Sequence, residues 1–394
     1  MFKYLACAIC ACVFSINAIA QSGGVQSILN QIEQNNTSLL AYRSLIEGQS
    51  RGLEVTNALQ PAQLIGYYLP FGEHTTADYY EIEIAQSFDF PSVYTARKEL
   101  IGLQQAQLAT AYDQKRQEVL LPAKQLCIGL IYLNKKYEVI SDRVEKAQQV
   151  MEQTQQLFDD EQLGIIELNK AKVGWLQIKY SLDQLESEQA ILRTRLEKLN
   201  GGQAVNLQET EYPDKTEVFN FESLWMEYSV ADPSLKMLAQ KEQVAAQQLM
   251  VTKRSNLPGI TAGYNAQGFQ GEYYSGFLAG LSFPIWKSNA KVNAAKALTD
   301  YRQQATTSGL QEARSHLLEL YQRYGQLQDG LAEYRSTLGG LGNEEFLREA
   351  YELGELSFIQ YYQEAQFYWQ AYDDMLLMER DLYQLLAELT KHKL

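Results

Sequence analysis

Few residues in this sequence are placed to perform catalysis or to bind a metal ion. Its three histidines, His74, His316 and His392, fall in a predicted loop, a long predicted helix and the C-terminal tail. Beyond the predicted signal peptide the chain has one cysteine, Cys127, and no H-x-x-H or C-x-x-C spacing of the kind that zinc sites use. We therefore expect no enzyme activity, no cofactor and no metal site.

Acidic residues gather instead at two predicted helical turns. Asp159, Asp160 and Glu161 lie at the first turn, and Glu352 and Glu355 at the second. In a symmetric assembly each group would become a ring of carboxylates, which attracts cations and repels anions. Charge runs are also common at ordinary solvated turns, so the pattern alone leaves both interpretations open.

The composition is that of an exported, acidic protein. The chain has 48 Asp and Glu against 34 Lys and Arg, so no basic surface is available for nucleic acid. Residues 1–20 resemble a signal peptide, with Lys3, an apolar stretch and Ala18-Ile19-Ala20 before the cleavage point. Its cysteines lack a convincing lipoprotein cleavage site, so we do not predict a lipid anchor, and the sequence leaves open whether one is attached. No later stretch has eighteen consecutive apolar residues, so no transmembrane helix is expected.

The chain contains two related halves. Asn-Thr-Ser-Leu at 36–39 resembles Asp-Pro-Ser-Leu at 232–235, and Phe-Asp-Phe-Pro at 88–91 resembles Leu-Ser-Phe-Pro at 281–284. A further match, between 163–168 and 356–361, keeps the same spacing as the second. The sequence therefore predicts an internal duplication. We place the first repeat at 21–200, a linker (equatorial) segment at 201–222 and the second repeat at 223–394.

Each half is expected to contribute two strands. Residues 80–90 and 273–283 alternate apolar with polar or small side chains, and 63–69 and 260–267 are their weaker partners. In a membrane sheet Tyr79, Glu81, Glu83, Ser87 and Asp89 would face the lumen, and Ile82, Ile84, Phe88 and Phe90 would face lipid. We single out Glu81, Glu83 and Asp89 as the lumen charges. The same alternation fits a soluble sheet with one buried face.

Very long helices follow the strands. The stretch 92–158 has apolar residues at alternating spacings of four and three, and at 1.5 Å per residue it would be roughly 100 Å long. Such a repeat predicts coiled-coil seams. The second half is expected to carry a comparable rod that runs to a turn near Gly354. Pro122 lies inside the first rod and should kink it or mark a helix junction.

Four strands cannot close alone, because an unpaired strand edge in lipid costs several kcal/mol per group. Two chains would give eight strands, whose interior is filled by side chains, whereas three give twelve and leave a passage. The predicted fold is mainly α with β: a long coiled-coil α-helical barrel plus a transmembrane β-barrel of four strands per chain, completed by trimerisation.

These features together resemble the TolC family of outer-membrane efflux proteins. The resemblance rests on the A-x-A signal, the duplication, Gln-Ser-Phe-Asp-Phe-Pro-Ser-Val-Tyr at 86–94 and Tyr-Glu-Leu-Gly-Glu-Leu-Ser at 351–357. The 86–94 stretch is similar to the heavy-metal (CzcC/CusC-like) branch. The family implies a homotrimer in outer-membrane lipid with a periplasmic helical tunnel. It also implies a periplasmic adaptor and an inner-membrane pump of the resistance-nodulation-division (RND) type as partners.

The resemblance also suggests roles for the residues at the two helical turns. The expected periplasmic tip and aperture residues are Asp159, Asp160, Glu161, Glu167, Tyr351, Glu352, Gly354, Glu355, Gln360 and Gln363. The expected adaptor contacts are Leu163, Gly164, Ile165, Leu356, Ser357 and Phe358. Gln360 and Gln363 stand where the family often has aspartates, which favours a neutral constriction. Glu167 and Tyr351 would form a hydrogen-bonded latch between neighbouring hairpins. The alternative is that Glu167 is an ordinary surface carboxylate and the Tyr351 ring is packed.

We therefore expect a passive exit duct of a tripartite efflux system, with heavy-metal cations as cargo. A multidrug or type I secretion outlet would have the same architecture. A protein of another class, a periplasmic coiled-coil spacer that forms no pore, would share the helices but not the membrane sheet.

Overall fold

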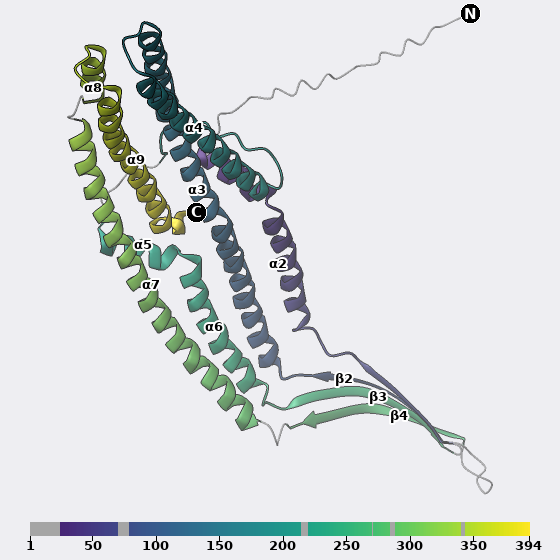
Figure 1. Ribbon diagram of the computed structural model, residues 1–394. Helices are drawn as coiled ribbons and strands as arrows, with labels where there is room; N and C mark the ends of the chain where they lie inside the picture. Colours follow the sequence, from purple (N-terminus) through teal and green to yellow (C-terminus); the bar gives the residue numbers. More distant parts are fainter. Residues whose placement is uncertain (1–23, 70–78, 214–219, 270, 284–287, 340–342) are drawn as a thin grey trace, which may run out of the picture.

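The computed structural model describes residues 24–69, 79–213, 220–269, 271–283, 288–339 and 343–394. The predicted signal peptide, His74 and Pro284 lie outside these residues. The molecule is elongated, with a β-sheet at one end and two helical hairpins at the other (Figure 1). Among the described helices, none is both long and apolar enough to cross a lipid bilayer.

Both halves follow the same order of elements. The first contains α1 (Val25–Asn35), α2 (Thr37–Val55), β1 (Gln63–Leu69), β2 (Tyr79–Phe88), α3 (Pro91–Asp159) and α4 (Ile165–Leu199). The second contains α5 (Phe221–Ala231), α6 (Pro233–Arg254), β3 (Gly259–Phe269), β4 (Glu272–Ser282), α7 (Ser288–Gly339), α8 (Asn343–Glu352), α9 (Phe358–Leu389) and the short η1 (Lys391–Lys393). Helix α5 starts two residues before the predicted second repeat.

The first matching tetrapeptides begin with helix caps. The Asn36 side chain accepts a hydrogen bond from the Leu39 amide and so starts α2. Asp232 accepts bonds from Ser234 and Leu235 and so starts α6. Each cap satisfies amides that an uncapped helix would leave unpaired. Because Asn36 is extended, α1 and α2 are separate helices.

The sheet is antiparallel, in the order β1-β2-β3-β4. Its register places Ile84 of β2 beside Leu64 and Tyr264, and Tyr264 beside Phe277 of β4. The apolar residues of β2 therefore share one face with apolar residues from the other strands. At the far end of this face the Tyr80 ring covers Gly268, where any Cβ would collide with the ring.

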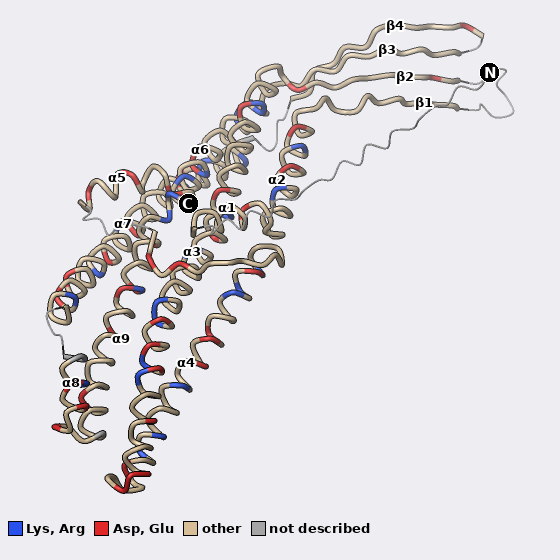
Figure 2. Tube along the Cα trace, turned by 90° about the horizontal axis from the view of Figure 1, so that it is seen from above, with Lys and Arg blue, Asp and Glu red and all other residues tan. Residues whose placement is uncertain are grey.

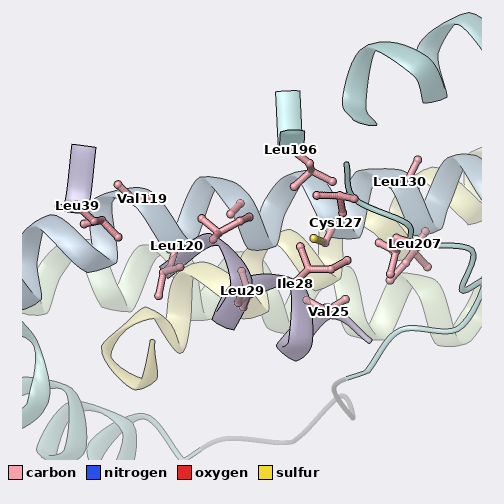
Figure 3. Close-up of a cluster of buried hydrophobic side chains, with 14 residues drawn as sticks. Val25, Ile28, Leu29, Leu39, Val119, Leu120, Cys127, Leu130, Leu196 and Leu207 are labelled. Carbon is pink, nitrogen blue, oxygen red and sulfur yellow. The ribbon is translucent and has the colours of Figure 1, made fainter. Parts of the chain in front are cut away.

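Helices α3 and α4 form the first hairpin, and their seam is the predicted one. Leu130, Leu133 and Ile140 of α3 are buried, as are Ile178 and Leu185 of α4. Helix α3 has 69 residues and continues through Pro122, so the expected helix junction there is wrong. Its neighbours in sequence are buried in a core cluster with α1 and α4 (Figure 3), and this packing offsets the hydrogen bond that proline cannot make.

The second hairpin was predicted to carry a rod that runs to a turn near Gly354. Helix α7 is described to Gly339, and α8 runs from Asn343 to Glu352, just before the left-handed Gly354. Residues 340–342 lie outside the described part of the chain, so the expectation of one continuous helix there stays a prediction.

The segment after α4 ties the two halves together. Val205 and Leu207 are buried in the first core cluster. The Asn134 side chain donates hydrogen bonds to the carbonyls of Leu207 (3.2 Å) and Glu209 (3.0 Å). Further along, the ring of Tyr212 stacks on Tyr383 of α9, with ring centroids 4.0 Å apart.

Candidate functional site

The two hairpin tips have the same backbone geometry. In each turn two successive amides donate to one carbonyl, that of Leu157 in the first tip and Ala350 in the second. The left-handed position is taken by Glu161 (φ 59°) in the first and by Gly354 (φ 74°) in the second. A left-handed residue closes a helix end tightly, and glycine adopts this conformation without steric cost.

The acidic residues of the tips are exposed. Asp159 ends α3 and accepts a hydrogen bond from the Gln155 side chain at 2.9 Å. Glu352 lies 3.8 Å from the Arg348 guanidinium. The turns are thus charged and solvated, which is compatible with either predicted role.

One hydrogen bond joins the two hairpins near their tips. The Tyr351 hydroxyl of α8 lies 3.2 Å from the Thr154 hydroxyl of α3. Thr154 is fully buried, and its own proton goes to the Val150 carbonyl at 2.7 Å. Tyr351 is therefore the donor, and its ring packs 5.2 Å from that of Tyr361.

The predicted latch therefore has a different acceptor. The partner of Tyr351 is Thr154, while Glu167 lies 3.4 Å from the Lys170 ammonium. One carboxylate oxygen of Glu167 is buried and makes no hydrogen bond with any described residue. The sequence did not single out Thr154, because no local pattern encodes the register between two hairpins, although Thr154 lies within the predicted rod at 92–158.

A groove of about 920 Å³ lies between the tips. Several residues predicted for the tip or the adaptor contact line this groove: Asp160, Leu163, Glu167, Tyr351, Glu352, Gly354, Leu356 and Ser357. Asp159, Glu161, Gly164, Ile165, Glu355, Gln360 and Gln363 do not line it. Gln360 instead completes a capping box with Ser357 at the start of α9, and Gly164 precedes α4 as its cap. The Phe358 side chain is not among the side chains that the structure describes.

A second groove, of about 670 Å³, runs between α4 and α9. Gln363 lines it together with Ile166, Val173 and Tyr362. The Tyr362 hydroxyl donates to the Gln177 side chain at 3.3 Å. The polar side chains that line this groove with Gln363 carry amides, a hydroxyl and the Lys170 ammonium group, and none of them carries a carboxylate.

Charged pairs join the hairpins further from the tips. Arg143 of α3 lies 2.9 Å from Asp373 of α9, and Lys136 lies 3.6 Å from the same carboxylate. Glu379 of α9 pairs with both Lys135 of α3 (3.0 Å) and Arg335 of α7. These pairs were not predicted from the sequence. The sequence feature that could have revealed them is the one-heptad spacing of Lys136 and Arg143, which places both side chains on the same side of α3.

The polar face of the sheet holds an acidic group. Glu81 accepts hydrogen bonds from the side chains of Tyr79 and Asn265. Glu83 shares this face, because strand residues two apart point the same way. Asp89, the third predicted lumen charge, pairs with Arg97 at 2.7 Å, where the sheet meets α3. Its charge is therefore neutralised locally.

We find no catalytic or metal-binding arrangement in the described part of the chain. Within it, no group of three or more His, Cys, Asp or Glu side chains is close enough to hold a metal ion. Ser50 lies in a Gly-x-Ser-x-Gly sequence that the sequence analysis passed over. It sits in the middle of α2 rather than at the strand-to-helix turn that a nucleophilic serine requires.

Comparison with known proteins identifies the fold. No protein-family model and no curated protein matches the sequence. Among solved structures, CusC, described as forming a transmembrane channel, is similar with a TM-score of 0.76 at 13% identity over 93% of this chain and 91% of that one. The Campylobacter jejuni CmeC outer-membrane channel (TM-score 0.67, 13% identity) matches over 93% and 85%. The Neisseria gonorrhoeae MtrE outer-membrane channel (0.69, 13%) matches over 93% and 88%. The chain thus has the fold of TolC-family channels, and these neighbours are channels rather than enzymes.

Proposed function

We propose that this chain is the protomer of an outer-membrane exit duct, which passes substrate from the periplasm to the exterior and performs no chemistry itself. The observation that carries this proposal is the two-faced sheet. Its apolar face exposes Leu64, Ile84 and Phe277, the last with 95% of its surface accessible. Within the described strands, acidic residues occur only on the other face and Lys and Arg occur on neither. A charge-free, aromatic outer face suits lipid.

Assembly into a homotrimer follows from the open sheet. In the described strands β1 and β4 each have one hydrogen-bonded neighbour, so both edges are available. Edges in lipid must be paired, and three copies are the smallest number that pairs them around a passage.

The helices support the same assembly through a second apolar face on α4. Ile178 and Leu185 are buried against α3. Ile166, Val173 and Tyr180 are exposed, lie one heptad apart and, at 100° per residue, fall on the opposite side of the helix. Helix α4 is at one edge of the layer of helices and α7 is at the other (Figure 2). Within this chain α4 packs on α3 and approaches α9 across the second groove, yet the side chains of this second face remain exposed. An apolar helix face that stays exposed in one chain suits a neighbouring copy.

The exposed edge of α7 complements that of α4. Gly325, Ala332 and Gly339 lie one heptad apart, and an added Cβ at either glycine would meet nothing within 4 Å. Bulky side chains of α4 in one copy would pack over these small residues of α7 in the next. Helices α4 and α7 run in opposite directions, so this contact continues the up-and-down order of the layer (Figure 2). A head-to-tail contact of this kind closes into a ring.

The partners and cargo follow the resemblance. The groove between the tips, with Leu163, Leu356 and Ser357 at its rim, is proposed as the docking site of a periplasmic adaptor, through which an inner-membrane RND pump delivers substrate. Heavy-metal cations are the proposed cargo, on the strength of the 86–94 stretch. CmeC and MtrE match this chain at the same sequence identity as CusC, so the structural matches do not favour the heavy-metal branch over others. Export of organic compounds or of polypeptides is therefore the alternative.

Two experiments test these proposals. Membranes of producing cells should contain heat-modifiable trimers in the outer-membrane fraction, and purified trimers should give discrete conductance steps in planar bilayers. A water-soluble monomer without conductance would overturn the proposed exit duct and favour a periplasmic coiled-coil spacer.

A strain that lacks this protein tests the cargo. Sensitivity of this strain to divalent metals, but not to lipophilic dyes, would support metal export; the opposite result would contradict it.

A further inference from the structure

The last residues of the chain enter the junction between its two halves. Leu386 and Leu389 of α9 belong to the core cluster of the second half, whereas Leu394 packs against that of the first. Between them, the buried Gln117 side chain of α3 donates a hydrogen bond to the Lys391 carbonyl at 2.9 Å. The same amide lies 3.3 Å from Asp232, the cap of α6. Residues 391–394, which we call the C-terminal clasp, thus contact elements of both halves.

A histidine lies at the centre of this clasp. The His392 side chain is 1% exposed, and its ring meets the edge of Tyr228 of α5 with centroids 5.3 Å apart. Neither ring nitrogen makes a hydrogen bond within the described residues. The nearest carboxylate oxygen, of Glu227, is 3.5 Å from Nε2.

The charges around His392 offer little compensation for a positive ring. Glu227 of α5 is half exposed and already lies 3.3 Å from Lys393. The carboxylate of Asp232 accepts bonds from the first turn of α6 and from Gln117. Lys391 pairs with Glu388 of α9, and the facing side chains from α3 and α5, Gln117 and Tyr228, are neutral.

Burial therefore decides the protonation of this ring. Removal from water lowers the pKa of His392 below its ordinary value near 6.5, against the weaker opposing attraction of Glu227. A base whose pKa is lowered in the docked state binds its proton more readily when undocked. The docked state is then most stable at neutral pH, and it loses stability as the pH falls below the ordinary value.

We propose that residues 391–394 form an acid-sensitive clasp, which holds α3 against α5 and α6 while His392 is neutral and is released when the ring becomes charged. Release frees Gln117 and the cap of α6 and exposes the Tyr228 ring. The junction between the two halves would then become looser at acidic pH, without any change in the sheet or in the hairpin tips.

The test is amide hydrogen exchange of the full-length folded protein between pH 7.5 and 5.0, corrected for the intrinsic pH dependence of exchange. We expect protection of peptides covering 386–394 to fall by up to about tenfold per pH unit between the ordinary histidine pKa near 6.5 and the lower docked-state pKa, and to level off below the latter. In His392→Gln this pH dependence should disappear. The matched control His316→Gln, at an exposed histidine of α7, should behave like the unmodified chain.

A second variant keeps the proposal testable if His392→Gln does not fold. Glu227→Gln removes the carboxylate that lies 3.5 Å from the ring, so the docked state tolerates a charged ring less well and the midpoint of release should move to a higher pH. The proposal is overturned if the C-terminal peptides of the unmodified chain stay equally protected at both pH values. It also fails if His392→Gln retains the dependence, or if Glu227→Gln moves the midpoint downward. None of these readouts requires conductance.

Discussion

At the scale of single residues, burial controls chemistry more than residue type does. Cys127 is the one cysteine in the described chain, and its side chain is fully buried in the core cluster shown in Figure 3. Burial raises the pKa of its thiol to about 12. The reactive thiolate is therefore almost absent at any physiological pH.

We predict that Cys127 does not react with a thiol-specific maleimide at pH 8 in the folded protein and reacts fully after denaturation. Val55→Cys, at a position with 70% exposure on α2, is the matched control and should react at once. Mass spectrometry of labelled protein gives the measurement. Rapid labelling of Cys127 in the folded chain would show that this core opens easily.

The hydrogen bond between Tyr351 and Thr154 joins the two hairpins near their tips, and its effect can be isolated by mutation. We predict that Tyr351→Phe and Thr154→Val each weaken the contact between α8 and α3. A buried hydrogen bond contributes about 1 kcal/mol. The two changes should therefore be non-additive by about that amount in a double-mutant cycle. The measurement is the exchange protection of the α8 amides, and strict additivity would mean that the hydroxyls do not interact.

At the scale of elements, the charged pairs are expected to hold the second hairpin on the first. The Arg143 side chain is 5% exposed, and it also donates to the Trp369 carbonyl at 3.4 Å. Removing one partner of a buried pair costs about 3–5 kcal/mol when the other charge is left uncompensated. Asp373 would keep Lys136 at 3.6 Å, so the cost of losing Arg143 should be smaller. An exposed pair contributes about 0–1 kcal/mol.

We therefore predict that Arg143→Ala destabilises the helical region by about 2 kcal/mol, through the hydrogen bonds that Arg143 makes to Asp373 and Trp369. Arg51→Ala, which breaks the exposed pair with Glu47 on α2, should change stability by under about 1 kcal/mol. Urea denaturation followed by the helical circular-dichroism signal compares the two. Equal effects would indicate that Arg143 is solvated and that the hairpins are held by apolar packing alone.

These elements show what a sequence can and cannot predict. The strands and α3 were predicted to within a few residues, because alternation and heptad spacing are local patterns. Contacts between hairpins, such as Tyr351 with Thr154 and Arg143 with Asp373, depend on a register that no local pattern specifies.

At the scale of the whole molecule, the pairing of helices fixes which residues would meet between copies. Lys135 of α3 and Arg335 of α7 both contact Glu379, so these positions lie at one level. The Asn134 side chain beside Lys135 accepts a hydrogen bond from Gln189 of α4 at 3.1 Å. The same level therefore extends from α7 at one edge of the layer to α4 at the other.

Ile191 of α4 and Ala332 of α7 lie within one turn of that level and are both exposed, Ile191 by 51%. If α4 of one copy packs on α7 of the next, these two side chains should meet. We predict that the Ile191→Cys, Ala332→Cys double variant forms disulfides between chains on mild oxidation, which non-reducing gels would resolve as covalent dimers and trimers. The native Cys127 is too deeply buried to interfere.

The control moves one partner along the same edge. Val173 has the same kind of side chain and exposure as Ile191, but it lies 18 residues nearer the tip, roughly 27 Å along the helix. A disulfide requires Cα atoms within about 7 Å. The Val173→Cys, Ala332→Cys pair should therefore stay monomeric on the gel. Cross-linking of this pair instead of the first would mean that neighbouring copies meet with a different stagger, and cross-linking of neither would place other helices at the contact.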